Sequence, residues 1–415
     1  MDTNLPLAVF SIDFRGAIEL RDPRTDQPPA GPHWLRGGPA QPVAYPAGAA
    51  PAIEVAFLNL RYLSDGVPVA AIYARGTGGG VARRRVPLSF DGAGLSEPLR
   101  FTLAAPLPAA IGEHHYRFDW FAAYAGRPDL YLGSTEHRIF TTWRPAAPPL
   151  PAWAYAPVLA WSCQWAAGAD SPKAICDALI GNLALSGLSY GLEGSQSVRS
   201  LLLRGGGTCG GWYRLFQSLA ACQGVEVLRR DLTVVTDREL PPAGDRLWDG
   251  VVAAGAGLNQ PAPAVDPYDF AEERERFPIG PAPVAVERVI ARRYAFRGQP
   301  RALVGVADST HALNFLVAED GTTYLYDPSF GAGPLPWPGA PPEPGSFVSG
   351  AALAAFKASY LDQAFPFLIG SIRNGEVWYE TIWRAAPGQS QYGLLVASGL
   401  VPPEALTIGW SVNGD

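Results

Sequence analysis

The hydrophobic pattern of the chain changes its period near residue 150, and this change limits the folds that its 415 residues can adopt. Before this point, short runs rich in alternating or β-branched residues are separated by Gly, Pro and Asp, a pattern typical of antiparallel strands. The runs are residues 7–14, 52–63, 69–75, 81–90, 99–103, 115–123 and 130–143. We therefore expect residues 1–145 to form an all-β domain with the outline of a sandwich.

A proline-rich segment, residues 146–157, follows and is interpreted as a stiff linker. Beyond it, apolar residues recur at helical spacing over residues 174–185 and again over 212–222, where Gly224 is a natural helix stop. Further strands are expected at 225–235, 302–306, 311–317 and 322–326, and a helix at 350–364. Residues 158–415 are therefore predicted to form a second domain of the α+β class. Its Pro/Gly-rich stretch near 236–290 is interpreted as an insertion.

The composition excludes several classes of protein. Hydrophobic residues make up 48% of the chain, and the net charge of −6 comes from interspersed signs, so we do not expect a nucleic-acid partner. No stretch of 18 apolar residues predicts a membrane span. The first five residues lack the features of a secretory signal, and the cysteines have no C-x-x-C spacing. We expect a reduced, cytoplasmic protein without a metal site, with signal-less export as the alternative.

One cysteine has an unusual neighbourhood. Residues 203–212, Leu-Arg-Gly-Gly-Gly-Thr-Cys-Gly-Gly-Trp, surround Cys209 with five glycines where the second helix begins. A helix N-terminus lowers a thiol pKa, its free N–H groups can bind an oxyanion, and glycines let a substrate approach closely. Cys163 and Cys176 lack this setting, and Cys222 lies on an apolar helical stripe typical of a core. Cys209 is therefore the candidate nucleophile.

The histidines narrow the choice of a base. Four of the five lie within residues 1–145, and only His311 follows the cysteine. It opens a pair of expected strands that ends in Asp327. Cysteine catalysis needs a base beside the thiolate and a group that orients the base. We therefore assign His311 as the base and Asp327 as the orienting carboxylate.

The loop between the two strands decides whether His311 and Asp327 can meet. Because side chains alternate along a strand, a two-residue turn at 320–321, which the Asp-Gly pair favours, would place them on opposite faces. A three-residue loop over 319–321 pairs Leu313 with Asp327 and puts both residues on one face as diagonal neighbours. We predict this odd-length loop, or a compensating bulge, and a His311–Asp327 hydrogen bond.

These segments resemble transglutaminase-like proteins. Gly-Thr-Cys leading into the helix resembles that family's nucleophile helix, and His-Ala-Leu-Asn-Phe followed by Tyr-Leu-Tyr-Asp-Pro-Ser-Phe resembles its His strand and Asp-Pro strand. The resemblance covers about residues 160–335. It implies a papain-like catalytic core, here preceded by an Ig-like β-sandwich, and a thioester intermediate formed with protein or peptide amides. It implies no metal or organic cofactor. By analogy with papain-like enzymes, Gln164 is a candidate for oxyanion binding.

Two alternatives stay open. Arg204–Gly206 before Cys209, and Phe330-Gly331 after Asp327, also resemble motifs of arylamine N-acetyltransferases, which share the same triad. Acetyl transfer to an arylamine is therefore one alternative. The other is a non-enzymatic transglutaminase-like scaffold whose β-domain recruits a partner protein.

Overall fold

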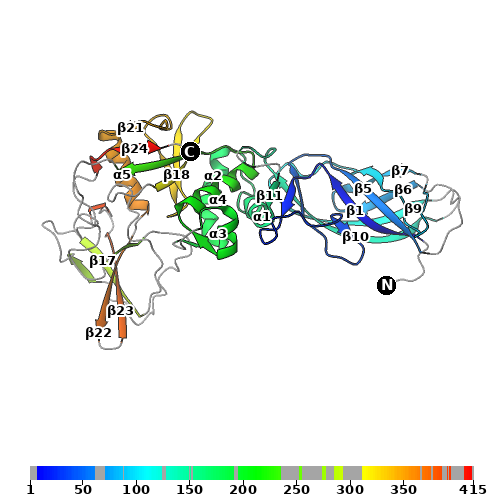
Figure 1. The fold of residues 1–415 in the computed structure, drawn as a ribbon, viewed down its shortest axis with the longest axis horizontal. Coiled ribbons are helices and arrows are strands. Elements are labelled where there is room, and N and C mark those ends of the chain that lie inside the picture. The colour runs from blue at the N-terminus through cyan, green and yellow to red at the C-terminus, as the bar shows by residue number, and fades with distance from the viewer. Residues whose placement is uncertain are drawn as a thin grey trace. The chain divides into compact units, whose positions relative to one another are not determined.

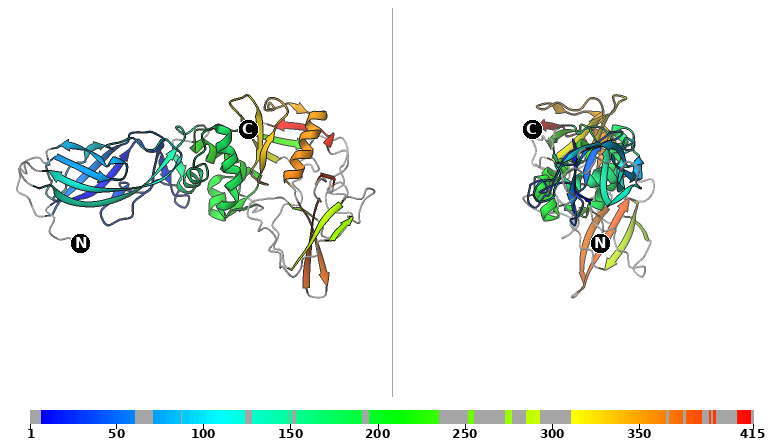
Figure 2. Two further views of the ribbon diagram at one scale, coloured as in Figure 1. Left: turned by 180° about the vertical axis from the view of Figure 1, so that it is seen from behind. Right: turned by 90° about the vertical axis from the view of Figure 1, so that its right-hand side faces the viewer.

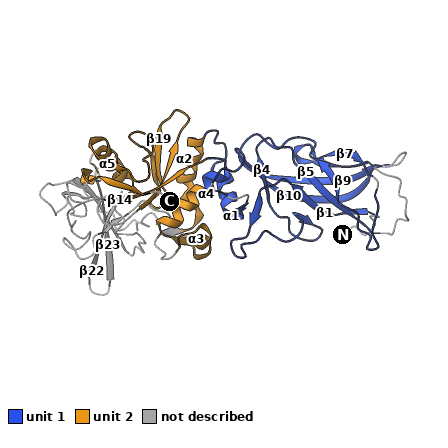
Figure 3. Ribbon diagram, turned by 45° about the horizontal axis from the view of Figure 1, so that its top comes forward, with its two compact units in different colours: residues 1–171, 218–225 blue, residues 172–217, 226–415 orange. Residues whose placement is uncertain are grey.

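The protein, described by a computed structural model, has an α+β architecture with several sheets (Figure 1). The described residues are 7–60, 71–86, 88–123, 128–148, 150, 153–190, 195–234, 252–254, 273–276, 285–292, 311–364, 367–374, 377–385, 390, 392–393 and 406–413. The chain divides into two compact units (Figure 3). Unit 1 comprises residues 1–171 and 218–225, and unit 2 comprises residues 172–217 and 226–415.

Unit 1 contains two main sheets (Figures 1 and 2). The four-stranded sheet runs in the order β3 (Trp34–Leu35), β1 (Leu7–Arg15), β5 (Ala52–Asn59) and β8 (Leu99–Thr102). The five-stranded sheet runs in the order β4 (Val43–Pro46), β10 (Leu130–Thr142), β9 (Gly112–Ala123), β6 (Ala71–Gly76) and β7 (Val81–Arg85). Each of the seven strand-like runs in this part of the sequence therefore contains a strand.

Alternation along the strands of unit 1 produces its core. On β9, Phe118 and Trp120 are buried, whereas Arg117 between them is exposed. Trp120 meets Phe57 of the other sheet edge-to-face, with 6.3 Å between ring centroids. The inner faces of the two sheets thus share one apolar cluster.

The proline-rich segment differs from a simple linker at its end. Strand β11 (Trp153–Tyr155) pairs in parallel with β2 (Glu19–Arg21), and helix α1 (Ala156–Trp165) begins directly after it. Pro157 occupies the first turn of α1, where the N–H that proline lacks has no partner within the helix. Unit 1 therefore includes a helix that the strand pattern of residues 1–145 did not predict.

Unit 2 is built around a six-stranded sheet. Its order is β20 (Ala332–Pro336), β19 (Thr323–Asp327), β18 (His311–Val317), β14 (Leu228–Val234), β24 (Trp410–Asn413) and β21 (Phe347–Val348). Its helices are α2 (Pro172–Asn182), α3 (Val198–Arg204), α4 (Cys209–Cys222), whose last residues count with unit 1, and α5 (Ala351–Ala364). The predicted helices over 174–185, 212–222 and 350–364 are confirmed in type, and Gly224 after α4 has a φ of 75°.

Adjacent residues of β19 show that helices contact both faces of this sheet. Tyr326 stacks on Phe216 of α4 and donates its hydroxyl to Asp177 of α2, at 2.8 Å. Asp327, the next residue, instead accepts from Tyr360 of α5. Because neighbouring side chains of a strand point to opposite faces, α5 lies on one face, and α2 and α4 on the other.

Five further strands form a second large sheet in unit 2. Its order is β15 (Val252–Ala254), β22 (Phe367–Asn374), β23 (Val377–Ala385), β17 (Ala285–Arg292) and β16 (Glu273–Arg276). Strands β15, β16 and the first part of β17 are the described portions of the Pro/Gly-rich stretch near 236–290. The expected strand at 302–306 lies outside the described residues. In the described part of the chain, every helix is too short or too polar to cross a membrane.

Candidate active site

The segment before α4 fixes where Cys209 sits. Helix α3 ends at Gly205, which has left-handed backbone angles, and residues 206–207 form the two-residue strand β13, parallel to β12 (Ser189–Tyr190). The Thr208 carbonyl then accepts hydrogen bonds from the N–H groups of Gly211 and Trp212. Thr208 therefore occupies the N-cap position, and Cys209 is the first residue of the 14-residue helix α4.

The glycines around Cys209 differ in how strictly their surroundings exclude a side chain. A Cβ on Gly207 would lie 2.5 Å from the carbonyl oxygen of Ser195, and one on Gly211 would lie 2.6 Å from the same atom. These two positions therefore require glycine because the chain's own backbone passes there. Gly210 is less constrained, since its nearest neighbour, the Gln196 side chain, would be 3.5 Å away. Of these three glycines, Gly210 is therefore the one whose lack of a side chain leaves room for a substrate.

The turn between β18 and β19 has the predicted odd length. Val317 pairs with Thr323, and Ala318 accepts from the N–H of Gly321 while its own N–H donates to Thr322. Residues 319–321 therefore form a three-residue loop, with Gly321 in the left-handed region at φ 81°. The same register continues to place Leu313 opposite Asp327. The loop prediction is confirmed.

His311 and Asp327 consequently share one face of the sheet and form a hydrogen bond. The distance from Nε2 of His311 to Oδ2 of Asp327 is 3.0 Å, and both side chains are buried. The predicted hydrogen bond is therefore confirmed. The Phe330 ring lies 5.4 Å from the imidazole, centroid to centroid, and shields one of its sides.

Three donors surround the Asp327 carboxylate. Oδ1 accepts from the backbone N–H of Ser329 at 2.9 Å, and Oδ2 accepts from His311 and from the Tyr360 hydroxyl, the latter at 2.5 Å. Asp327 has no exposed surface, so burial without these donors would be costly for its charge. The arrangement holds a carboxylate anion beside an imidazole.

Cys209 completes the chain of contacts. Its side chain is half-buried, and it lies close enough to His311 and to the backbone N–H of Ala312 for both to lower its pKa. Because Nε2 of His311 is bound to Asp327, the imidazole nitrogen left for Cys209 is Nδ1. The structure therefore brings the three residues chosen from the sequence into one connected group within unit 2.

The electrostatics of this group favour an ion pair. Burial alone would raise the pKa of Cys209, but the hydrogen bond and the positive charge of His311, with the N–H of Ala312, lower it below the ordinary thiol value. Burial would lower the pKa of His311, yet the charge and hydrogen bonds of Asp327 and Cys209 raise it. Opposite shifts of this kind stabilise a thiolate beside an imidazolium.

The pKa values of the other three cysteines are shifted in the opposite direction. Burial raises the pKa of Cys163 to about 12, and it also raises the pKa values of Cys176 and Cys222. All three are buried, as core cysteines commonly are. A lowered thiol pKa among the cysteines is therefore confined to Cys209.

Gln164, the candidate oxyanion ligand, lies in α1 and counts with unit 1. Its side-chain amide donates to the carboxylate of Glu113 on β9, at 2.8 Å. Its oxyanion role stays a prediction. The backbone supplies other donors, because the N–H groups of Cys209 and Gly210 open α4 and precede the helix's own hydrogen-bond ladder.

Tyr360 is the residue of this group that the sequence analysis did not identify. It lies on α5, in the buried stripe shared by Phe356 and Leu361. A tyrosine inside an apolar helical stripe was a usable signal, because a buried tyrosine hydroxyl normally has a hydrogen-bond partner. The sequence alone does not say which partner it has.

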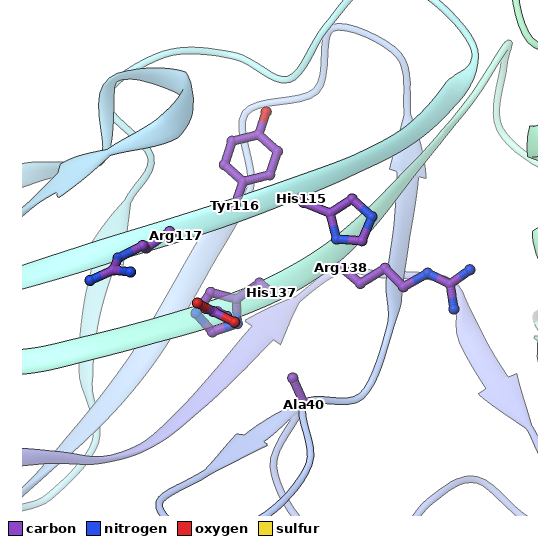
Figure 4. Close-up of a pocket in the computed structure, with 7 residues that line it drawn as sticks. Ala40, His115, Tyr116, Arg117, His137 and Arg138 are labelled. Carbon is purple, nitrogen blue, oxygen red and sulfur yellow. The ribbon is translucent and has the colours of Figure 1, made fainter. Parts of the chain in front are cut away.

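A cavity of about 380 Å³ lies elsewhere, over β9 and β10 of unit 1 (Figure 4). Its lining residues are Ala40, His115, Tyr116, Arg117, Glu136, His137 and Arg138. The two arginines are engaged with carboxylates, Arg138 with Glu113 and Arg117 with Asp119. The catalytic candidates are not part of this lining. Within the described ranges, no cluster of His, Cys, Asp and Glu is arranged to hold a metal ion.

Comparisons with known proteins give little further information. No protein-family model matches the chain, and no curated protein matches it. Among solved structures, a "putative protease" from Parabacteroides distasonis is similar over 98% of this chain and 99% of its own, with 6% sequence identity and a TM-score of 0.18. A likeness of this size carries no argument about fold or function.

Proposed function

We propose that the chain is a cysteine-dependent acyl-transfer enzyme of the transglutaminase-like type, acting on protein or peptide amides through a thioester. The observation that carries the proposal is the connected group of Cys209, His311 and Asp327, in which the thiol opens a helix and its pKa is lowered. Residues 7–142 would then form an Ig-like sandwich that precedes a papain-like catalytic domain and places the substrate or a partner. A cytoplasmic location belongs to the same proposal.

The proposed reaction begins with the thiolate of Cys209 attacking an amide carbonyl carbon. The carbonyl oxygen becomes an oxyanion, which the N–H groups at the start of α4 stabilise. The imidazolium of His311 gives its Nδ1 proton to the leaving amine, and the C–N bond breaks to leave a thioester. Water or a second amine, deprotonated by His311, then attacks the thioester and releases Cys209. Asp327 holds the imidazole in the tautomer that these steps need.

The experiment is incubation of the full chain with peptide libraries rich in glutamine and asparagine. Mass spectrometry would report deamidation, cleavage or crosslinking, and also an acyl adduct on Cys209. We expect Cys209→Ala to abolish both product and adduct. Cys222→Ala is the matched control, because it removes a buried thiol from the other end of the same helix.

The same experiment separates the alternatives. Acetylation of an arylamine by acetyl-CoA, without amide turnover, would support an arylamine N-acetyltransferase. A chain that gives neither product nor adduct with any library would leave the scaffold interpretation and overturn the proposal. Activity that survives in Cys209→Ala would overturn the assignment of the nucleophile.

A further inference from the structure

The Asp327 carboxylate carries one more contact than a His–Asp pair requires. Oδ2 of Asp327 accepts from Nε2 of His311 at 3.0 Å and from the Tyr360 hydroxyl at 2.5 Å. The two donors reach this atom from different elements, His311 from β18 and Tyr360 from α5. A short hydrogen bond from a hydroxyl to a carboxylate is charge-assisted, and such bonds are about twice as strong as neutral ones.

We propose that Tyr360 is a positioning residue of the catalytic group, which acts on His311 and Cys209 through the carboxylate of Asp327. This inference rests on the proposed function. Tyr360 does not touch the reacting atoms. Its hydroxyl holds Oδ2 in the orientation that the imidazole needs, and it gives a hydrogen-bond partner to a carboxylate that is completely buried.

Helix α5 does not depend on this hydroxyl for its attachment to the sheet. Phe356, one turn earlier on α5, contacts the Trp337 ring at 4.8 Å and the Trp410 ring at 6.3 Å, both edge-to-face. Tyr360 itself stacks on Phe356, with 6.5 Å between centroids, through its ring. A phenylalanine at position 360 would keep these ring contacts and remove the hydroxyl's bond to Asp327.

The groups around Asp327 decide in which direction the loss of the Tyr360 hydroxyl moves the pH dependence of Cys209. Among the described residues, His311 meets its carboxylate from β18, Tyr360 from α5 and the Ser329 N–H from its own loop, with Cys209 beyond the imidazole. A carboxylate held against the imidazole favours the imidazolium, and the imidazolium favours the thiolate of Cys209. Without the hydroxyl, Oδ2 of Asp327 is fixed by one donor fewer and is held less firmly against Nε2 of His311. The imidazolium is then less well stabilised, and the thiolate of Cys209 forms only at a higher pH.

The test is the pH dependence of alkylation of Cys209 by iodoacetamide, followed by peptide mapping in the full chain. In Tyr360→Phe we expect the acid limb to move to higher pH by roughly one unit. We also expect kcat/KM on the amide substrate to fall by about 10- to 100-fold, the range found when the hydrogen-bond partner of a metal-ligating residue is removed. Because alkylation needs no substrate, it reads the site directly.

Tyr326→Phe is the matched control. It makes the same change at the residue next to Asp327 and also removes a tyrosine-to-carboxylate hydrogen bond, that to Asp177 at 2.8 Å on the opposite face of the sheet. We expect Tyr326→Phe to change the melting temperature without moving the acid limb. A second probe is 3-fluorotyrosine at position 360, which keeps the ring and is a stronger donor. It should move the acid limb to lower pH, opposite to phenylalanine.

The outcomes separate this inference from the proposed function. If Cys209 of the wild-type chain alkylates with the pH dependence of an ordinary thiol, the proposed function fails. If the wild-type thiolate forms at low pH but the profile of Tyr360→Phe superimposes on it, Tyr360 is structural only and the inference is overturned. Equal shifts in Tyr360→Phe and Tyr326→Phe would also overturn it. Should Tyr360→Phe not fold, an unchanged acid limb with the fluorinated residue would have the same meaning.

Discussion

The two units each contain a buried histidine, and the two histidines have opposite properties. His137 lies on β10 of unit 1, between the rings of Phe14 and Phe118, with 5.1 and 5.2 Å between centroids. Its Nε2 meets only the hydroxyl of Thr135, at 2.9 Å. Burial, with a smaller effect from His33, lowers the pKa of His137 to about 3, so the ring is neutral.

His311 in unit 2 is equally buried and also lies against a phenylalanine ring, yet its pKa is raised. The difference is the carboxylate of Asp327, which is buried with it, and the thiol of Cys209. Burial therefore does not make a histidine a base. A buried histidine becomes a charged group only when an anion is buried beside it, and this distinguishes the candidate active site from the core of the sandwich.

The largest effect on the reaction rate is expected from removing the carboxylate of Asp327. In Asp327→Asn, His311 should behave like His137, because the amide neither attracts a proton to the imidazole nor fixes its tautomer. We expect kcat to fall by about 10⁴-fold, as it does when the carboxylate of a catalytic triad becomes an amide. The measurement is the initial rate on the amide substrate identified by mass spectrometry.

Asp177→Asn is the control for this comparison. Asp177 accepts from Tyr326 on the other face of the same sheet, and it pairs with Lys173 on its own helix. Its removal should lower stability and leave the rate within a few-fold of wild type. A similar loss of rate in both variants would mean that the carboxylate of Asp327 acts through the fold and not through His311.

A smaller difference is expected between the alkylation rates of the two cysteines at the ends of α4. Cys209 and Cys222 share this helix, but the pKa of Cys209 is lowered by His311, whereas burial raises that of Cys222. Each unit of pKa changes the thiolate fraction tenfold, so Cys209 should alkylate at least roughly 100-fold faster near pH 7. Peptide mapping after a brief treatment with iodoacetamide gives this ratio. Equal labelling of the two cysteines would contradict the electrostatic account of the site.

The smallest effect concerns stability and comes from His137. Its folded pKa lies below the ordinary value of about 6.5, so between these values the unfolded chain binds the proton more readily. The free energy of unfolding of unit 1 should therefore fall as the pH falls from about 6.5 toward 3, by up to ~1.4 kcal/mol per pH unit. His311 contributes with the opposite sign, since its stabilisation is present below about pH 6.5 and is lost as the pH rises through its raised pKa.

Hydrogen exchange can isolate the contribution of His137. Peptides from β9 and β10 should lose protection as the pH falls, after correction for the intrinsic exchange rate, and His137→Phe should remove this dependence because the ring no longer titrates. Peptides from β18 and β19 in the same sample are the internal control and should respond alike in both chains. An unchanged pH dependence in β9 and β10 of the variant would refute the assignment.

The sequence alone predicted those structural elements that are determined by residues close together in the chain. The seven strands predicted within residues 7–142 and helix α4 follow from residue period, and the loop at 319–321 follows from the demand that His311 and Asp327 share a face. Strand β11 could not be predicted, because its parallel pairing with β2 joins residues more than a hundred positions apart and has no local pattern. The bond from Tyr360 to Asp327 depends likewise on which face of the sheet α5 covers.

The three-residue loop between β18 and β19 has a consequence for comparing homologous chains. Deleting one of residues 319–321 would leave a two-residue turn, and two strands paired through it would have every side chain of β19, Asp327 included, on the opposite face relative to His311. A chain altered in this way would keep all three candidate residues and, under the proposed function, would be a pseudoenzyme. The number of residues in this turn is therefore a better marker of the proposed triad than the presence of its three residues in an alignment.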